Sequence, residues 1–359
     1  MRTFPGACCI ALASLLPIAV YAAQAPCNDA ASTCMEMVSV PGENNGTLVY
    51  RNYSLGTAQP DVKRALIVIH GLGRNASGYY RSALAGAFLA DASTDTIVVA
   101  PHFSSSEGVC KDRLQAGEIG WHCQPRHDTW HTGGPAVGGT VTSFDVVDEL
   151  LRRLNRKDLF PNLREIVVAG HSAGGQFVQR YAMSNEVQDT LAVKPTYVVM
   201  NPSSYAYLDD LRPTERAFAE HIAALAPGFH EALPEKAPPA FARYHDAKDC
   251  TGYDTWPYGL KDRNGYAAKV SDELLKKQAV ERPVTFLAGE YDILPLHDFD
   301  GSCAAMAQGA TRLARAFAYV KYIDEKYGAK HEAHMVGGCG HSGRCMLGAG
   351  GSLKYLFPR

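Results

Sequence analysis

The stretch Glu165-Ile-Val-Val-Ala-Gly-His-Ser-Ala-Gly-Gly-Gln-Phe177 gives the strongest indication of the fold. Residues 165–169 form a short, mostly β-branched run, which is typical of a buried strand, and a helical pattern follows over residues 176–183. The glycines between them permit a turn that is too tight for larger side chains. The stretch therefore predicts a strand, a sharp turn and a helix, with the hydroxyl of Ser172 lifted clear of the backbone at the turn.

Similar apolar runs alternate with helical patterns along the chain. The runs cover residues 65–69, 96–100, 196–200, 284–288 and 333–336, and the helical patterns cover residues 144–154, 176–183 and 310–327. This alternation predicts an α/β fold, with a mostly parallel sheet and helices on both faces. We expect residues 203–280 to be a cap inserted into one domain that spans residues 23–359. Residues 103–141 lack periodicity and suit a long loop over a binding site.

The N-terminus predicts export. Arg2 precedes an apolar stretch over residues 7–20 and the small residues Ala22 and Ala23, which is the pattern of a signal peptide. We predict a signal peptide over residues 1–22, with cleavage after Ala22 and a secreted or periplasmic mature chain. The apolar stretch is shorter than the ~20 residues of a membrane-spanning helix, so no stable membrane insertion is expected. The net charge of −2 argues against a nucleic-acid partner, because such partners favour a clustered basic face.

The cysteines predict disulfides. Of the ten cysteines, Cys8 and Cys9 lie in the predicted signal peptide, and an even number remains for an exported chain. Short separations favour three pairs and leave the fourth by elimination: Cys27–Cys34, Cys110–Cys123, Cys339–Cys345 and Cys250–Cys303. Because eight cysteines allow about a hundred pairings, this connectivity is a hypothesis. A zinc site would need closely spaced pairs such as Cys-x-x-Cys, and the sequence has none.

Ser172 needs a base and an acid to act as a nucleophile. An imidazole must take the hydroxyl proton and a carboxylate must hold the imidazole, and in sheets with this turn both follow the serine in sequence. Asp292 is the candidate acid, because it comes just after the strand predicted over residues 284–288, at the edge where sites assemble in parallel sheets. Its rivals are Glu290, Asp298 and Asp300.

His341 is the candidate base, because it lies on a Gly-rich loop beyond the last predicted strand. Its rivals His331 and His334 lie before or within that strand, where a structural imidazole is expected. Cys339 and Cys345 flank His341 and, if bridged, would restrict its movement.

An oxyanion formed during acyl transfer needs two backbone N–H donors. Ala173, the residue after the serine, is expected to supply one. We expect the second from the loop His70-Gly-Leu-Gly-Arg-Asn75, with Leu72 as the donor and Gly73 as the alternative.

The predicted long loop concentrates aromatic and imidazole side chains. Trp121 and Trp130 are candidates for a wall of the substrate pocket, and the alternative is that both pack beneath a disulfide-held loop. A metal site is the other use for such side chains, but the spacing of its candidate ligands matches no recognised pattern: His122, His127, Asp128 and His131. No metal and no cofactor are predicted, since serine hydrolysis requires neither.

Together, the His70-Gly71 loop with Arg74-Asn75, the turn at Ser172, the Gly289-x-x-Asp292 segment and the Gly-Cys-Gly-His341 loop resemble the α/β-hydrolase superfamily over roughly residues 60–357. Within it, the chain resembles secreted esterases and depolymerases related to feruloyl esterases and polyhydroxybutyrate depolymerases. The resemblance implies the α/β-hydrolase fold and a hydrolase that acts through an acyl-enzyme, with the roles given above to Ser172, Asp292 and His341. It implies no particular substrate, because the fold hosts many activities.

The predicted function is hydrolysis of a carboxylic ester, small or polymeric. A peptidase or amidase would use the same residues and is the first alternative. The second is a non-catalytic binding module of the same fold, although such modules usually lose a catalytic position and every candidate position is filled here. The sequence does not predict the oligomeric state.

Overall fold

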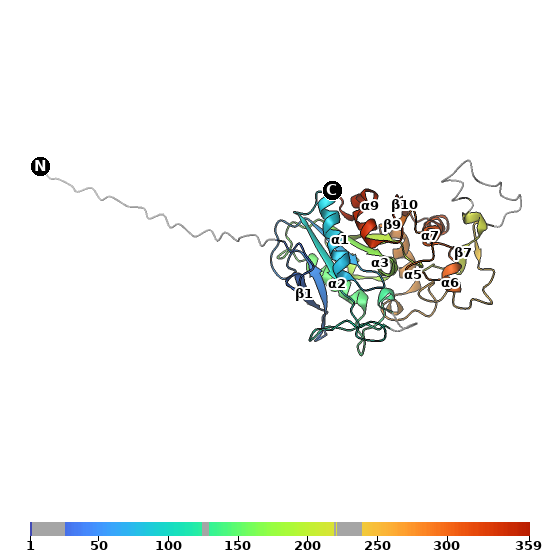
Figure 1. Ribbon diagram of the computed structural model, residues 1–359, viewed down its shortest axis with the longest axis horizontal. Helices are drawn as coiled ribbons and strands as arrows, with labels where there is room; N and C mark the ends of the chain where they lie inside the picture. The colour runs from blue at the N-terminus through green and yellow to red at the C-terminus, as the bar shows by residue number, and fades with distance from the viewer. Residues whose placement is uncertain (2–25, 124–128, 219, 221–238) are drawn as a thin grey trace.

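The structure is a computed structural model that describes the chain except for residues 2–25, 124–128, 219 and 221–238, which are grey in Figure 1. Its centre is an eight-stranded sheet in the order β1-β2-β4-β3-β5-β6-β9-β10. The strands are β1 (Met35–Ser39), β2 (Gly46–Arg51), β3 (Arg64–Ile69), β4 (Thr96–Pro101), β5 (Glu165–His171), β6 (Pro195–Met200), β9 (Val284–Gly289) and β10 (Glu332–Val336). Neighbours from β4 to β10 are parallel, whereas β2 is antiparallel to β1 and β4. The predicted mostly parallel sheet is confirmed and contains all six predicted strands.

Helices cover both faces of the sheet, as predicted. One hydrophobic core lies between the sheet and α2, α3, α5 and α7, and a second lies beneath α1, α8 and α9. The helices are α1 (Ala76–Leu89), α2 (Ser143–Leu154), α3 (Ala173–Ser184), α5 (Asp272–Glu281), α6 (Cys303–Met306), α7 (Arg312–Tyr327), α8 (Gly343–Gly348) and α9 (Gly350–Leu356). In Figure 1, β1 lies toward one end of the molecule and α7 toward the other.

Burial on both faces explains why the strands are continuously apolar. In β3, Ile67 and Ile69 belong to the first core, and Leu66 and Val68 belong to the second. Successive side chains of a strand point to opposite faces of the sheet. A strand covered on both faces therefore needs an apolar residue at every position.

Capping residues set the ends of the helices that support the site. Thr142 and Asp145 form a reciprocal capping box at the start of α2. The side chain of Thr311 accepts from the backbone N–H of Ala314 at the start of α7, and Gly328 ends that helix with a φ of 70°. The cap at Thr311 makes Arg312 the first residue of α7.

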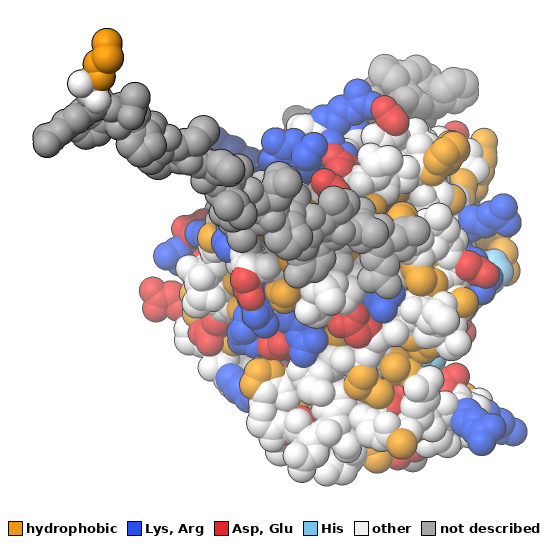
Figure 2. Space-filling model, turned by 90° about the vertical axis from the view of Figure 1, so that its left-hand side faces the viewer, with side chains coloured by type: hydrophobic (Ala, Val, Ile, Leu, Met, Phe, Trp, Pro, Cys, Tyr) orange, Lys and Arg blue, Asp and Glu red, His pale blue; other side chains and the backbone are white. Residues whose placement is uncertain are grey.

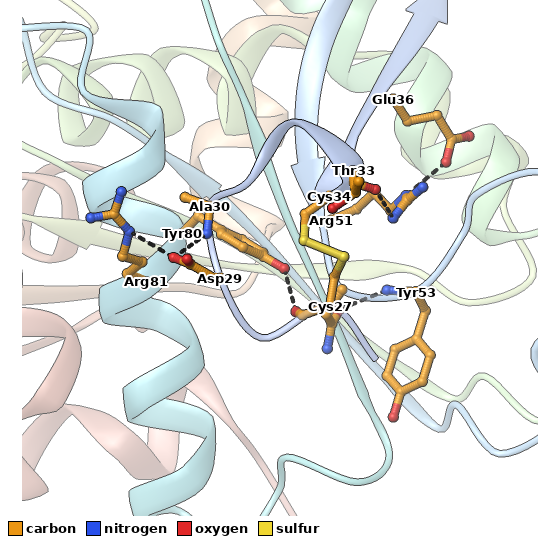
Figure 3. Close-up of a disulfide and its surroundings, with 11 residues drawn as sticks. Cys27, Asp29, Ala30, Thr33, Cys34, Glu36, Arg51, Tyr53, Tyr80 and Arg81 are labelled. Atoms are coloured by element: carbon orange, nitrogen blue, oxygen red, sulfur yellow. Dashed lines mark hydrogen bonds and ion pairs between the residues drawn. A yellow bond between two sulfur atoms is a disulfide. The ribbon is translucent and has the colours of Figure 1, made fainter. Parts of the chain in front are cut away.

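The N-terminal segment anchors the two antiparallel edge strands, which the sequence analysis did not predict. Cys27 is bonded to Cys34, and the hydroxyl of Tyr80 in α1 donates to the carbonyl oxygen of Cys27 at 2.7 Å (Figure 3). Arg51 of β2 forms an ion pair with Glu36 of β1 at 2.9 Å. The edge of the sheet is thereby tied both to itself and to a helix on one face.

Asn52, the residue after β2, is 5% exposed. Its Nδ2 donates to the carbonyl oxygen of Thr96 at 2.9 Å, and its Oδ1 accepts from the backbone N–H of Val98 at 2.8 Å. The amide therefore bonds the backbone of β4 just past the point where β2 ends. A buried backbone group left without such a partner would be destabilising.

Charged side chains of both signs are interspersed over the described surface on the side of the molecule that Figure 2 shows. The interspersed charges agree with the small net charge of −2. Partly buried charges also pair, as do Arg64 and Asp95, whose Nη1 and Oδ1 atoms are 2.8 Å apart.

The segment over residues 203–280, predicted as a cap, contains a separate two-stranded sheet of β7 (Leu211–Pro213) and β8 (Phe241–Arg243). Its described part packs beside α7, where the ring of Tyr207 lies 4.5 Å from that of Tyr322. Residues 221–238 of the segment lie outside the described residues. The capping role of the segment therefore stays a prediction.

All four predicted disulfides are present: Cys27–Cys34, Cys110–Cys123, Cys250–Cys303 and Cys339–Cys345. Disulfides persist in oxidising compartments, so they favour an extracytoplasmic protein. Among the helices of the described residues, none is long and apolar enough to cross a membrane. The predicted signal peptide, apart from Met1, lies outside the described residues.

Candidate active site

Ser172 occupies the predicted turn between β5 and α3. It adopts φ 59° and ψ −122°, a conformation that non-glycine residues rarely take. The tightness of the turn is also visible at Gly174, where an added Cβ would lie 2.3 Å from the carbonyl oxygen of Ile69. The strained turn places the serine at the carboxyl edge of the parallel strands.

Ser172, His341 and Asp292 form one hydrogen-bonded chain. The Nε2 atom of His341 lies 2.9 Å from Oγ of Ser172, and its Nδ1 lies 2.8 Å from Oδ2 of Asp292. Because the carboxylate can only accept, Nδ1 carries the proton and Nε2 accepts from the serine hydroxyl. Asp292 is 2% exposed, so water does not compete for its oxygens. The arrangement can pass the serine proton to the imidazole while the carboxylate holds the cation that results.

Asn201, the residue after β6, connects the loops that carry the acid and the base. Its Oδ1 accepts from the backbone N–H of Gly289 at 2.8 Å, and its Nδ2 donates to the carbonyl oxygen of Gly340 at 3.1 Å. The backbone N–H of Tyr291 also donates to the carbonyl oxygen of Cys339 at 2.8 Å. Asp292 follows Tyr291 and His341 follows Gly340, so these bonds hold the acid-bearing and imidazole-bearing loops at a fixed separation.

The rival acids and bases make no hydrogen bond to Ser172 or His341 among the described residues. Glu290 accepts from the backbone N–H of Gly338 at 2.9 Å, and Asp300 accepts from the hydroxyl of Tyr258 at 2.8 Å. Asp298 lines the pocket without reaching the imidazole. His331 bonds the carbonyl oxygen of Ala279, and His334 bonds Glu332.

The two predicted oxyanion donors both border the serine. Leu72 lines the pocket there, and Ala173 is the first residue of α3. Within the part of the chain that the structure describes, neither backbone N–H donates to another residue. Both groups are thus free to meet a developing negative charge.

His70 orders the loop that carries Leu72. Its Nε2 accepts from the backbone N–H of Phe103 at 3.1 Å, so Nδ1 is protonated and donates to the carbonyl oxygen of Gly71 at 2.8 Å. Burial lowers the pKa of His70 to about 3, which keeps this imidazole neutral. Arg74 secures the other end of the loop by donating to the carbonyl oxygen of His122 at 2.6 Å.

A pocket of about 200 Å³ opens at the serine. Its walls come from residues 71–75, from Tyr79 of α1, and from His297 and Asp298 after β9. The described residues of the predicted cap do not line it. The pocket is large enough for a small acyl or alcohol group beside the nucleophile.

Tyr79 and His171 lie beside the imidazole of His341. The hydroxyl of Tyr79 is 2.9 Å from Nδ1 of His171, and the rings of His171 and His341 are 4.7 Å apart. Burial, with repulsion from His341, lowers the pKa of His171 well below its usual value. Burial raises the pKa of Tyr79 to about 12, so its hydroxyl stays protonated at physiological pH.

Trp121 and Trp130 lie in the core and not in the wall of this pocket. They are 0% and 1% exposed, and their rings pack on Phe103 at 5.3 and 5.2 Å. Trp121 borders a different pocket, of about 320 Å³, beside the loop. Of the two alternatives that the sequence left open, packing beneath the loop describes where the two tryptophans lie. The loop folds these rings inward onto Phe103, just after β4.

Some residues around the site had no assigned role in the sequence analysis: Tyr79, His171, His297 and Arg312. His171 stands within the decisive stretch, and its position before the serine is the signal that was available. Tyr79 and Arg312 reach the site through contacts distant in sequence, for which the local pattern gives no signal.

Within the described residues, no group of three or more His, Cys, Asp or Glu side chains is arranged to hold a metal ion. Nδ1 of His122 donates to Oε2 of Glu107 at 3.1 Å. Two of the candidate ligands weighed from the sequence, His127 and Asp128, lie outside the described residues.

Comparisons with known proteins place the chain in a family. The alpha/beta hydrolase family model matches residues 66–348. No curated protein sequence matches the chain. Among solved structures, LpqC, a poly(3-hydroxybutyrate) depolymerase from Bordetella parapertussis, is 20% identical with a TM-score of 0.54, over 87% of this chain and 89% of its own. Poly(aspartic acid) hydrolase-1 from Sphingomonas sp. KT-1 is 22% identical with a TM-score of 0.51, over 86% of this chain and 93% of its own. At these identities the structural likeness shows the fold, and the match to the family model over most of the chain shows that the protein belongs to the alpha/beta hydrolase family.

Proposed function

We propose that the protein is a secreted serine hydrolase that cleaves carboxylic esters through an acyl-enzyme on Ser172. The observation that carries the proposal is the hydrogen-bonded chain from Ser172 through His341 to Asp292. It joins a nucleophile, a base and an orienting acid in the order that nucleophilic catalysis requires. The pocket at the serine and the two N–H groups beside it supply the remaining parts.

In the proposed acylation step, Oγ of Ser172 attacks the ester carbonyl carbon while Nε2 of His341 takes the hydroxyl proton. The carbonyl oxygen becomes negative and accepts from the backbone N–H groups of Leu72 and Ala173. The C–O bond to the alcohol then breaks, and the leaving oxygen takes the proton from His341. The acyl group remains on Ser172, and Asp292 stabilises the imidazolium while it exists.

In the proposed deacylation step, a water molecule takes the place of the alcohol. Nε2 of His341 accepts a proton from this water as its oxygen attacks the acyl carbon, and the same two N–H groups stabilise the second oxyanion. The bond to Oγ breaks, the proton returns to Ser172, and the carboxylic acid leaves. The net reaction consumes one water per ester bond.

The names of two similar proteins bear on the substrate class. LpqC is described as a poly(3-hydroxybutyrate) depolymerase, and poly(3-hydroxybutyrate) is a polyester. This description supports an ester substrate, small or polymeric, for this chain. The name of the poly(aspartic acid) hydrolase makes an amide the alternative to test. Secretion, by way of the signal peptide proposed over residues 1–22, accords with the four disulfides.

Covalent labelling tests the nucleophile. Purified mature protein treated with an activated fluorophosphonate should gain the mass of one adduct, because the probe reacts with an activated serine. Ser172→Ala should gain none, whereas Ser77→Ala, which changes a serine outside the pocket, should label like the wild type. An unlabelled wild type would contradict the assignment and favour the binding-module alternative, whereas an adduct that persists in Ser172→Ala would mean that another residue is the nucleophile.

Paired substrates test the bond that is cleaved. We expect higher kcat/KM for p-nitrophenyl acyl esters than for p-nitroanilides with the same acyl group, and the loss of both activities in Ser172→Ala. A preference for the anilides would make the protein an amidase or peptidase that uses the same residues.

A further inference from the structure

Arg312 is the first residue of α7 and lies beside the proposed catalytic acid. It is 1% exposed, and its Nη1 atom is 3.2 Å from Oδ1 of Asp292. Asp292 thus uses one oxygen for Arg312 and the other for His341. A buried carboxylate needs such partners, because losing water without compensation would be strongly unfavourable.

The same guanidinium also holds the loop that forms one wall of the pocket. Nη1 donates to the carbonyl oxygen of Leu296 at 2.9 Å, and Nη2 donates to that of His297 at 2.7 Å. Nε donates to Oγ of Ser203 at 2.8 Å, which fixes the plane of the group. One planar side chain therefore connects the acid, the pocket wall and the segment after β6.

The wall needs this support, because its backbone is strained. His297 and Asp298 have φ values of 53° and 55°, in the left-handed region that non-glycine residues rarely occupy. The ring of His297 lies nearly parallel to that of His341, with an interplanar angle of 17° and a centroid separation of 6.2 Å. Arg312 bonds the carbonyl oxygen of Leu296, which precedes this strained pair, and that of His297, its first residue.

We propose that Arg312 is a positioning residue for the triad. It holds the carboxylate of Asp292 and the backbone of residues 296–297 as one unit, and so fixes the imidazole of His341 between the acid and Ser172. This inference rests on the proposed function, since it assigns Arg312 a part in that reaction. Arg312 touches neither the substrate nor the reacting atoms, and it acts through Asp292.

A charge at this position has a consequence for the pH profile. The guanidinium stays protonated, and its positive charge opposes a second positive charge on His341. Two rings face the imidazole, that of His171 from β5 and that of His297 from the loop after β9, while Asp298, Asp300 and Arg315 lie close enough to Arg312 to act on its charge. None of these groups differs between Arg312→Met and Arg312→Lys, so the difference between those two variants reports the charge at position 312.

Two substitutions separate the charge from the geometry, and a third serves as a matched control. Arg312→Met removes the charge and all the bonds, and Arg312→Lys keeps a cation without the planar fork. Arg315→Met is the control, because Arg315 is on the same helix, is 0% exposed and donates to backbone carbonyl oxygens, including that of Asp300 at 3.0 Å. No hydrogen bond joins Arg315 to Asp292 in the described structure, so its loss measures destabilisation alone.

Kinetics against pH give the first readout. In Arg312→Met, the acid limb of kcat/KM should move to higher pH, because the imidazolium is no longer opposed by a nearby cation. Its kcat should fall roughly tenfold to hundredfold while KM changes less, as expected of a misplaced catalytic group. Arg312→Lys should keep the wild-type acid limb with a reduced kcat. Arg315→Met should lower the melting temperature and leave the acid limb in place.

Proton NMR gives a readout that needs no substrate. The Nδ1 proton of His341, bonded to Asp292, should give a far-downfield signal that is absent in His341→Ala. The signal should be lost or broadened in Arg312→Met and retained in Arg315→Met.

If the wild type shows the signal but hydrolyses nothing, the proposed function fails while the positioning role stands. If Arg312→Met does not fold, Arg312→Lys decides, and a wild-type kcat in Arg312→Lys would overturn the proposal. A folded Arg312→Met protein with an unchanged NMR signal and an unchanged acid limb would overturn it as well.

Discussion

Two other imidazole rings lie close to the imidazole of His341. The ring of His171 lies 4.7 Å away and that of His297 lies 6.2 Å away. In the proposed reaction His341 becomes positive, and a second positive imidazole beside it would oppose that change. Burial lowers the pKa of His171 well below its usual value, so the closer neighbour presents a neutral surface at physiological pH.

Gly71 is a position where a methyl group should lower activity. An added Cβ would lie 2.8 Å from the hydroxyl oxygen of Tyr79 and 3.5 Å from Cβ of Ser172. We expect Gly71→Ala to displace the loop that carries Leu72, the proposed oxyanion donor, and so to lower kcat roughly tenfold to hundredfold. Steady-state kinetics on p-nitrophenyl esters measure the effect.

Two further variants test the cause of that effect. Tyr79→Phe removes the oxygen that the new methyl group meets, so the double variant with Gly71→Ala should be more active than Gly71→Ala alone. Gly301→Ala is the control for a glycine-to-alanine change in a loop, because a Cβ there meets no atom within 4 Å. A double variant no better than Gly71→Ala would show that the clash is not the cause.

Helices α2 and α3 are joined by a buried carboxyl group. Asp148 of α2 accepts from the hydroxyl of Tyr181 of α3 at 2.6 Å and from that of Tyr266 at 2.8 Å. Burial raises the pKa of Asp148 to about 6, and the two tyrosine bonds oppose the rise. The folded protein thus binds a proton at this position more tightly than the unfolded chain does.

The raised pKa predicts how stability changes with pH. A group whose folded pKa lies above its unfolded value of about 3.9 stabilises the fold fully below that value, and the contribution is lost as pH rises through about 6. Two pKa units correspond to roughly 3 kcal/mol. Asp148→Asn should therefore show a smaller fall in the free energy of unfolding between pH 4.5 and pH 7.5 than the wild type, by urea denaturation.

Asp324→Asn is the control for that experiment, because Asp324 is an exposed aspartate on α7. It should keep the pH dependence of the wild type. If Asp148→Asn keeps it as well, the carboxyl group of Asp148 is not its source.

Elements with a local signal were predictable from the sequence, and those without one were not. The six parallel strands were found because both cores demand apolar residues at every position. Helix α1 was missed because Tyr80 and Ala83 are buried while Phe88 and Leu89 are exposed, so no apolar stripe stands out. The edge strand β1 was missed because only Val38 among its residues is buried.

The same distinction applies to the site. Ser172, Asp292 and His341 could be proposed because each follows a strand in a recognisable loop, and the structure brings them into contact. Arg312 and Tyr79 bond partners that lie 20 and 92 residues away in sequence, and nothing in their own surroundings announces those contacts. Residues that act through tertiary contacts are found only once the fold is known.

The disulfides hold loops of very different lengths across the molecule. The sequence separation is 7 for Cys27–Cys34 and 53 for Cys250–Cys303, which joins the predicted cap segment to α6. In the chain-entropy account, a cross-link stabilises more when it closes a longer loop, by about 2 kcal/mol for the shorter of these and about 4 kcal/mol for the longer. The bond between residues 250 and 303 is thus expected to matter most for global stability.

Pairwise replacement by serine tests this order. Urea denaturation should show a larger loss of unfolding free energy for Cys250→Ser with Cys303→Ser than for Cys27→Ser with Cys34→Ser. The Cys339–Cys345 disulfide closes the shortest loop, with a sequence separation of 6. Its removal in Cys339→Ser with Cys345→Ser should cause a small loss of unfolding free energy but a clear fall in kcat, because the loop that carries His341 is no longer held. Equal stability losses for the first two pairs would contradict the dependence on loop length.

The buried side chain of Asn52 bears on the choice of expression host. Asn52-Tyr-Ser, like Asn45-Gly-Thr, is an acceptor sequence for N-linked sugar, and eukaryotic secretory machinery modifies such sites as the chain enters the lumen. Asn45 is exposed and could carry a glycan, but the nitrogen that a glycan on Asn52 would occupy is the one that donates to Thr96. We therefore expect chains glycosylated at Asn52 to fail to close β2 against β4, so that a yeast or insect-cell preparation would lose material that a bacterial host delivers folded.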